Sequence, residues 1–374
     1  MFTTMVQPSQ YELDAWQEIQ GFKGRQMSRR LGEAGQRVSE AAAAAGDRAS
    51  KYLDAHPQAQ AAVKRTQELA SKAARVGRVG AQGAAASAPL WVTTAGTSVQ
   101  RTTGRVARAG LTPKRVLSKH RKHGHDVSGL RDLRRLDLEQ IDAVRGHALS
   151  WVYPSAAALS GAGAGFAISG GELATVVSAG AAAAPSGGVI AGAFVGDAAA
   201  VLALGSRAVG RSALMYGYDP ESPAEKLFIM SVINAGSAVS AGAKSAAFAD
   251  LSKLTQSLVR DKTWKVLNET VVARVAGQFA KRFSFRLTKQ GLGKVVPAAG
   301  IVLGGALNWA TLEGIVDAAD IAYRRRFLLE KYPHLAESDT FGVADDSERG
   351  IPTDGDEEIS VIDEIAEAGG PDLA

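Results

Sequence analysis

The sequence contains no cysteine, and this absence excludes several classes of protein at once. Without thiols there is no disulfide framework, no cysteine nucleophile and no Cys-ligated zinc or iron–sulfur site. The chain has only six histidines among its 374 residues. Three of them fall in the run His120-Arg-Lys-His-Gly-His125, where the neighbouring cations would repel a metal ion. We therefore read this run as a basic surface loop, and we predict neither a metal nor a cofactor.

Sequence motifs that identify enzymes are also missing. There is no Gly-x-Ser-x-Gly elbow, no phosphate-binding loop and no HExxH pair. The run Gly161-Ala-Gly-Ala-Gly165 is not a dinucleotide fingerprint, because Phe166 occupies the position of the third glycine and no strand pattern leads into it. These absences remove the reactions that can be recognised from sequence, although they leave open an enzyme of another kind.

No stretch offers the roughly twenty consecutive apolar residues that a membrane-spanning helix needs. The smoothest segments are 155–171, which is mostly Ala, Gly and Ser, 173–204, which Asp197 interrupts, and 297–312, which is about four residues too short. Residues 1–20 are polar and lack the apolar core of a secretory signal. We expect a cytoplasmic protein that reaches the inner face of the cell membrane only peripherally.

What the sequence does contain is an uneven distribution of charge. The net charge is +5, but residues 336–374 carry thirteen acidic residues against the single basic Arg349. The tail therefore carries −12 and the remaining chain +17. A basic body attracts polyanions, and an acidic tail competes with them for the same surface.

Composition and periodicity predict an all-α fold. No segment shows sustained two-residue alternation with β-branched enrichment, whereas capping signals and helical spacing recur. Leu13, Trp16 and Ile19 lie at helical spacing near the start, and Ile359, Ile362 and Ile365 do so in the tail. We predict four regions: an N-terminal helix (1–31), a basic Ala-rich helical or partly disordered region (32–110), a compact core of Gly/Ala-rich helices (111–333) and a disordered acidic tail (334–374).

Helix boundaries are marked most clearly at three places. Thr112-Pro113 reads as an N-cap followed by proline at the first helical position, and Asp137 with Gln140 resembles a capping box. The connector is Tyr216-Gly217-Tyr218-Asp219-Pro220, and Ser222-Pro223 follow it. In this connector Gly217 ends one helix in the left-handed conformation, Asp219-Pro220 turn the chain, and Ser222 caps the next helix with Glu225 closing the box.

The connector, with Glu225-Lys-Leu-Phe228 after it, resembles the signature of the EcsC protein family. So do the glycine run 161–165, Asp197 and Arg207 spaced along one helix, and the closing block from Val296 to Phe327 that contains Asn308 and Asp317. The resemblance covers about residues 11–333. It implies an undefined biochemical role and, because the founding member is encoded beside an ABC-type transporter, such a transporter as a protein partner.

Polar residues inside the apolar helices are the candidate site. An ionised side chain in such a helix needs a partner, since burial alone costs several kcal/mol. Either these residues form a buried network that fixes helix register or they line an active site. Asp320 and Arg324 stand four apart in the favourable order. The candidate polar residues are Asp197, Arg207, Asn308, Asp317 and Asp320.

Glycines recur at four-residue spacing, at 161 and 165, at 188, 192 and 196, and at 300 and 304. Such faces let two helix backbones approach closely, either in a tightly packed core or within a membrane. We favour the core, because Asp197 and Asn308 suit a protein interior better than lipid. A membrane-inserting glycine-zipper protein is the alternative.

Fourteen Lys or Arg against five acids lie between Gly24 and Gly110, interleaved with small apolar residues. Weakly amphipathic basic helices of this kind either lie on anionic membrane surfaces or form a plain solvated basic face. We do not expect nucleic acid as a partner, because neither stacking aromatics nor a recognition helix is present. The leading hypothesis is a non-enzymatic, membrane-associated accessory protein. An enzyme that uses the polar candidates is the second hypothesis, and docking of the isoleucine stripe of the tail on the basic body is the third.

Overall fold

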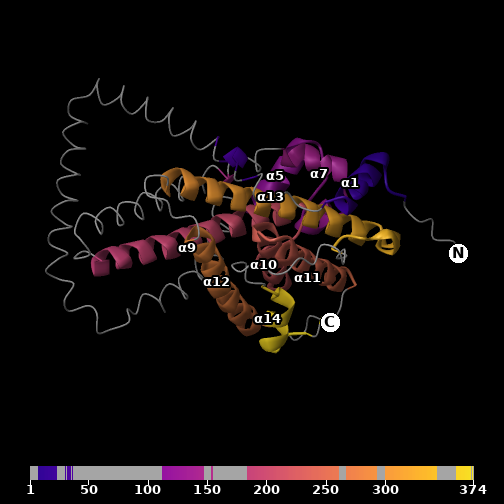
Figure 1. Ribbon diagram of the computed structural model, residues 1–374. Coiled ribbons are helices and arrows are strands. Elements are labelled where there is room, and N and C mark those ends of the chain that lie inside the picture. Colours follow the sequence, from indigo (N-terminus) through magenta and orange to yellow (C-terminus); the bar gives the residue numbers. More distant parts are fainter. Residues whose placement is uncertain are drawn as a thin grey trace, which may run out of the picture.

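The computed structural model describes residues 7–22, 30, 32–34, 36, 112–146, 153–154, 183–260, 267–292, 300–342, 359–371 and 373. Within these ranges the chain forms helices and no strand, so the all-α prediction is confirmed (Figure 1). The basic region 32–110 and the glycine run 161–165 lie almost wholly or wholly outside the described residues. The helices are α1 (Gln10–Gln20), α5 (Pro113–Lys122), α6 (Leu130–Leu133), α7 (Leu138–Arg145), α9 (Ala183–Met215), α10 (Pro223–Ser237), α11 (Ala241–Val259), α12 (Glu269–Leu292), α13 (Gly300–Lys331), the 3₁₀ turn η2 (Pro333–Ser338) and α14 (Val361–Glu367).

Helix α13 is the axis of the fold. It packs most extensively on α10 and α9, and it also contacts α1, α11 and η2. In Figure 1, α1, α5 and α7 lie along one side of α13, while α10, α11, α12 and α14 lie on the other. Side chains such as Ile315, Tyr323 and Leu328 are fully buried, so α13 is surrounded along much of its described length. Polar residues on this helix therefore have to find protein partners.

Glycine lets α10 and α13 approach each other closely. At Gly236 and Gly314 an added Cβ would collide with the backbone of the opposite helix. These two positions are therefore an example of glycine packing helix against helix, as predicted in general. The glycines predicted from the sequence are others and do not include these two. The predicted glycines at 188, 192, 196, 300 and 304 lie in helical segments whose side-chain surroundings are not described.

The predicted helix starts are largely confirmed. Thr112 caps α5 with Pro113 as its first residue, and Gln140 accepts a hydrogen bond from the backbone N–H of Asp137 over 3.0 Å at the start of α7. Ser222 caps α10, but Glu225 does not close a capping box. Its carboxylate is instead buried against α13, where it accepts hydrogen bonds from Arg326 and Tyr323 in place of a local backbone N–H.

The N-terminal helix is shorter than predicted. Helix α1 ends at Gln20 and Gly21 caps it, while Phe22 follows without helical structure. Trp16 and Ile19 face the core as expected, whereas Leu13 is 37% exposed. The predicted unit 1–31 is therefore not one continuous helix, because α1 ends at Gln20 and Phe22 is not helical; residues 23–29 lie outside the described part.

The prediction of a disordered tail is wrong for residues 359–371. Ile359 and Ile365 are buried, and α14, which begins two residues after Ile359 and contains Ile365, packs on α12, α10 and α11. Asn234 of α10 donates to the carbonyl of Ile359, which holds the start of this segment. The isoleucine stripe explains the error: burial of its apolar side chains favours docking on the basic core despite the strongly acidic composition.

In the described part of the chain, no helix is long and apolar enough to cross a bilayer. The described part does not include all three of the smooth segments considered above. Residues 155–171 lie wholly outside it, and so do the first residues of 173–204 and 297–312, which precede α9 and α13.

Candidate functional site: arginine and tyrosine networks around the connector

The candidate site is built on three consecutive arginines of α13. Successive helical residues point about 100° apart, so Arg324, Arg325 and Arg326 reach three different parts of the core. Each meets acidic side chains from other elements, and each is largely buried. The helix thus distributes three positive charges through the interior, and the acids that meet them hold neighbouring segments in place.

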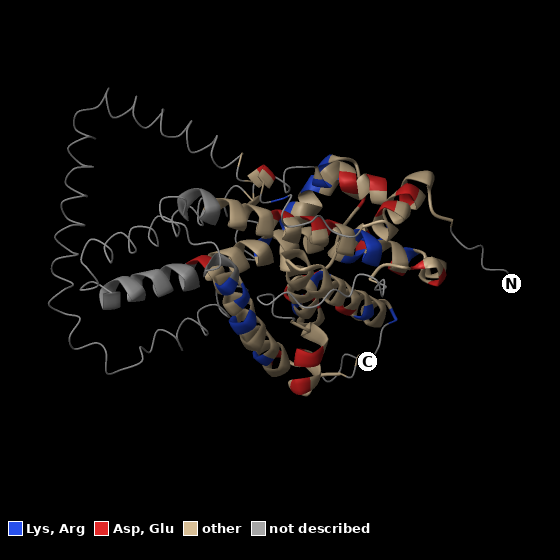
Figure 2. Cartoon of the chain, viewed as in Figure 1, with Lys and Arg blue, Asp and Glu red and all other residues tan. Residues whose placement is uncertain are grey.

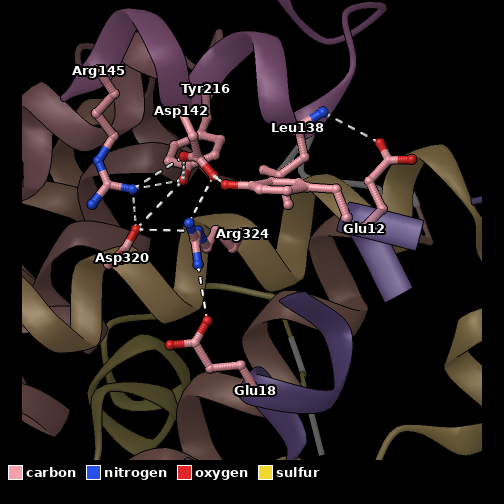
Figure 3. Close-up of polar contacts among 9 residues, drawn as sticks. Glu12, Glu18, Leu138, Asp142, Arg145, Tyr216, Asp320 and Arg324 are labelled. Atoms are coloured by element: carbon pink, nitrogen blue, oxygen red, sulfur yellow. Dashed lines mark hydrogen bonds and ion pairs between the residues drawn. The ribbon is translucent and has the colours of Figure 1, made fainter. Parts of the chain in front are cut away.

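Arg324 belongs to a network that joins α7, α9 and α13, shown in Figure 3. Its Nη2 lies 2.7 Å from Oδ2 of Asp142, and its Nε lies 3.6 Å from Asp320 one turn earlier. Arg145 donates to Tyr216 over 2.9 Å and also pairs with Asp320. The predicted pair of Asp320 and Arg324 is confirmed, and it is part of a larger set that we call the Asp142 network.

Burial and neighbouring charges fix the protonation of Tyr216 and Arg145. The pKa of Tyr216 is raised well above its usual value, chiefly by burial and then by Asp320 and Asp142. Burial by itself lowers the pKa of Arg145. The nearby Tyr216 and Asp320 raise this pKa by more than burial lowers it, so the net shift is upward. Tyr216 therefore stays a neutral hydroxyl and Arg145 a cation, and neither of them releases a proton near neutral pH. The network is an assembly of fixed charges that holds three helices together.

A second network surrounds Tyr218, two residues further along the connector. The Cζ atom of Arg326 lies 4.0 Å from the centroid of the Tyr218 ring, and Nη1 donates to Glu225 over 2.8 Å. Glu225 also accepts from the hydroxyl of Tyr323, and Glu330 pairs with Arg326 over 3.0 Å. Glu225, at 2% exposure, has both of its oxygens satisfied in this way, which offsets the cost of burying its charge.

Gly217 lies between the two tyrosines and sets their directions. Its φ of +83° is in the left-handed region, and an added Cβ would collide with the carbonyl oxygen of Leu130. Asp219 then turns the chain, accepting from the backbone N–H of Glu221 over 3.0 Å. The connector thus sends Tyr216 into one network and Tyr218 into the other.

A third buried acid fastens α1 to the core. Glu12 is 1% exposed and accepts from Tyr332 over 2.7 Å, from Lys331 over 3.0 Å and from the backbone of Leu138 over 3.3 Å. Burial alone raises the pKa of Glu12, but hydrogen bonds from Ser9, Tyr332 and Lys331 lower it further than burial raises it. Its charge is therefore retained inside the protein.

The family model of the EcsC protein family matches residues 94–328. That range includes the connector, the Asp142 network and all of the second network except Glu330, together with most of α13, and it covers more than half of the chain. The chain belongs to the EcsC protein family. The matched range begins later than the resemblance suggested from sequence, and α1, η2 and α14 lie outside it. Glu12 and the tail isoleucines therefore attach flanking elements to the EcsC region.

One curated relative is similar over a shorter stretch. The chain is 30% identical over 137 residues to a protein named "Uncharacterized protein YdbA" from Bacillus subtilis (strain 168). The match covers 36% of this chain and 47% of that protein, so the chain spans about half of the relative's length. No solved structure matches the chain.

The predicted polar residues do not converge within the EcsC region. Asp320 lies in the Asp142 network, whereas Asn308 donates to Asp197 over 2.6 Å and Asp317 pairs with Arg30 over 3.3 Å. Arg207 is half-buried on α9, and in the described residues it has no ion pair with any of these acids. An active site made of these residues requires a shared cavity, and the structure instead divides them among separate contacts.

A cavity of about 220 Å³ does lie near the second network, lined by Arg131, Arg134, Phe327, Glu330 and Lys331. Its charged groups are largely engaged already, since Arg134 pairs with Glu330 over 3.1 Å and Lys331 with Glu12. None of the predicted polar residues lines it.

The histidine run differs from the predicted loop. Helix α5 extends to Lys122, so His120 is helical, and its side chain is fully buried with Nδ1 at 3.1 Å from Nδ1 of His125. Among the described residues, no group of three His, Asp or Glu side chains is placed to hold a metal ion.

Sequence reasoning missed Asp142, Arg145, Glu225 and Glu12, which complete these networks. Asp142 and Arg145 were not selected, and Glu225 was expected only to close a capping box. Only their partners, which are 71 to 320 residues away, show their role. Spacing within one helix offers only the contact of Asp142 with Arg145, three residues apart, and none of the contacts between helices.

Proposed function

We propose that this EcsC family member is a non-enzymatic interaction protein that associates peripherally with anionic membrane surfaces on the cytoplasmic side. It acts there through a protein partner, for which the family resemblance suggests an ABC-type transporter. The proposal rests on how the fold distributes its charges, and on no bound ligand.

The observation that supports it most is that buried acids are paired internally while many cations face outward. Glu12, Asp142, Glu225 and Asp339 are all at most 12% exposed and paired with lysines or arginines. Exposed cations, by contrast, cover α5, where no acid occurs from Thr112 to His125. Helix α5 thus presents positive charge that no acid of its own segment neutralises.

Helix α5 illustrates the arrangement. Val116, Leu117 and His120 face the core, and the opposite side carries cations. The cations of α5 are Lys114, Arg115, Lys119, Arg121 and Lys122. Each Lys or Arg contributes on the order of 1 kcal/mol only when it lies within about 8 Å of an anionic bilayer at physiological salt. Helix α5 therefore shows that the surface is cationic, and it does not by itself decide which face lies on the bilayer.

Flotation with lipid vesicles tests the proposal. The full chain is mixed with vesicles of zwitterionic lipid alone or with 30–40% anionic lipid (roughly the range in which surface potential is substantial), at low salt and at high salt. We expect flotation with anionic vesicles at low salt and its loss at high salt. Failure to float with anionic vesicles at low salt would overturn the proposal.

The transporter partner is a separate part of the proposal. A photo-crosslinker placed on α5 should give a defined adduct in membranes that contain an ABC-type transporter, and no adduct in matched membranes that lack it. An identical adduct pattern in both would remove the transporter while leaving membrane association intact.

A further inference from the structure

Helix α12 carries a second cationic face, and this one includes an exposed aromatic ring. Arg274, Gln278, Lys281, Phe285 and Lys289 follow one another at intervals of three or four residues. On a helix this spacing places all five side chains on one side. Figure 2 shows Lys and Arg repeated along α12, and its only acid is Glu269 in the first turn. We call these five residues the α12 face.

Phe285 is the most exposed large apolar side chain in the described part of the chain. It is 54% exposed, whereas the next two, Tyr11 and Leu13, are each 37% exposed. The ammonium of Lys289 lies 5.8 Å from the centroid of the Phe285 ring, and Lys281 is one turn away on the other side. The ring is thus flanked by two cations in a position open to solvent.

The tail helix α14 covers one edge of α12 and stops short of this ring. Arg282 pairs with Glu364 over 3.0 Å, and Arg274 donates to the carbonyl of Ala368 over 3.0 Å. Lys281 and Lys289 have no ion pair in the described residues. Within the described residues, the end of the α12 face that holds Phe285 therefore has no protein partner, while the end near α14 is partly neutralised.

We infer that the α12 face is the surface that lies on the anionic bilayer. This rests on the proposed membrane association and specifies where it occurs. The stretch from Arg274 to Lys289 spans about 23 Å along the helix axis. A helix lying in the plane of the interface inserts its apolar residue among the headgroups, while flanking cations contact lipid phosphates. Phe285 supplies the first contact, and Lys281 and Lys289 supply the second.

Helix α5 lacks one half of this chemistry. Its apolar residues Val116 and Leu117 are buried, so its exposed side offers only charge. Tyr11 and Leu13 expose apolar groups on α1, a helix without Lys or Arg. Helix α1 instead carries Asp14 and Glu18, which an anionic surface would repel. Among these exposed sites only α12 combines cations with an apolar group.

The chemistry of the α12 face also favours lipid over a macromolecular partner. A protein interface needs a cluster of apolar and aromatic residues at its centre, and one phenylalanine between lysines does not provide it. Single-stranded nucleic acid is held by successive stacked aromatics, and α12 exposes a single ring.

Charge-matched variants test the location of the contact. Replacing Lys281 and Lys289 by Gln should weaken partitioning onto anionic vesicles roughly 30-fold, because each cation contributes about fivefold. Phe285→Ser should weaken it roughly tenfold. The control K114Q/K122Q on α5 removes the same charge and should change partitioning less than about threefold when all variants are compared at about 0.15 M salt, where charges more than roughly 8 Å from the bilayer are screened. Leu13→Ser controls for loss of an exposed apolar residue and should have no effect.

The absence of native cysteine allows a direct second measurement. An environment-sensitive fluorophore attached to F285C should shift its emission to the blue when anionic vesicles are added, and the same label on K122C should not. Circular dichroism confirms that each variant is folded before use. These side chains are at the surface, so the substitutions leave the core intact.

The outcomes separate the two proposals. If the unmodified protein does not float, membrane association itself fails, and the α12 inference fails with it. If the protein floats but the α12 and α5 charge variants weaken its partitioning equally, the α12 inference is overturned and membrane association stands. The same conclusion follows if the label at residue 122 responds in place of the label at residue 285. Flotation that no α12 variant changes would mean that the α12 face serves another partner, which also overturns the inference.

Discussion

The hydroxyl of Tyr216 donates to Oδ1 of Asp142 over 3.2 Å, and this contact joins the end of α9 to α7. The same hydroxyl accepts from Arg145 over 2.9 Å, so it is satisfied in both directions. Tyr218, two residues further along, is equally buried, but its hydroxyl has no hydrogen-bond partner among the described residues. The two tyrosines of the connector thus serve different purposes: one is a polar link, and the other is a platform for Arg326.

Phenylalanine substitutions should separate these purposes. Tyr216→Phe removes a buried donor and leaves Asp142 and Arg145 without that partner, so we expect the free energy of unfolding to fall by about 1–3 kcal/mol. Tyr218→Phe removes a hydroxyl without a partner and keeps the ring on Arg326, so the change should be within about 0.5 kcal/mol of zero or slightly stabilising. Urea denaturation measures both. Equal losses for the two variants would contradict the assigned contacts.

Gly217 provides a prediction with a close control. Gly124 has nearly the same φ, +84° against +83°, but a Cβ at Gly124 would meet nothing within 4 Å. Gly124→Ala should lower the free energy of unfolding by about 1–2 kcal/mol, because a residue with a side chain is less stable in the left-handed conformation. Gly217→Ala carries that cost and also the collision with Leu130, so its loss in unfolding free energy should be clearly larger. Thermal or urea melts that give the same value for both would show that the connector relaxes freely.

The pair of Glu225 and Arg326 should behave as a coupled unit. Glu225→Gln alone leaves a buried arginine poorly compensated, and we expect a loss of about 3–5 kcal/mol. Arg326→Met alone leaves Glu225 in the same situation. The double variant should lose less than the sum of the single variants, because each single change creates an unpaired buried charge that the other removes. A strictly additive result in urea denaturation would contradict this coupling, and Glu221→Gln, in the nearby turn, serves as the control.

Much of the fold could be predicted because its signals are local. The cap at Thr112, the turn at Gly217 and the start of α10 at Ser222 depend on residues within a few positions of one another. Backbone geometry and side-chain caps act over that same distance. The sequence therefore predicted the all-α class and several helix boundaries, and it failed at Gly21 and Glu225, where the local pattern permitted more than one outcome.

The partners of the polar residues could not be predicted, because they depend on which helices meet. Asp320 was selected as polar in an apolar helix, yet its partner Arg145 lies 175 residues away in α7. A helical pattern determines which residues share a face, and not which other helix covers that face. For the same reason Lys281, Phe285 and Lys289 were overlooked: their spacing was readable, but only packing shows that their side of α12 is exposed.

The docked tail can be tested by removing apolar contacts from α14. Ile365 is fully buried, and Gly370 packs against it. Ile365→Ala should lower the free energy of unfolding by about 2–4 kcal/mol through lost burial and the cavity left behind. Glu367→Ala, on the exposed side of the same helix, should change it by less than about 0.5 kcal/mol. Limited proteolysis near residue 360 should become faster in the first variant only; equal behaviour of the two would mean that α14 adds nothing to the stability of the core.

The buried His120 predicts how stability depends on pH. Burial, with smaller effects of His125 and His123, lowers the pKa of His120 to about 4, whereas in the unfolded chain it returns to about 6.5. Between these values the unfolded chain binds a proton that the folded chain does not, so the free energy of unfolding falls as the pH drops from about 6.5 toward 4 and is fully retained above 6.5. One proton corresponds to a slope of at most about 1.4 kcal/mol per pH unit. Urea denaturation at pH 7, 6 and 5 should therefore show a shallower pH dependence for His120→Gln than for the unmodified protein, while His123→Gln, altered at an exposed position, should keep the original slope. Parallel slopes for the unmodified protein and His120→Gln would mean that His120 is not held neutral by its burial.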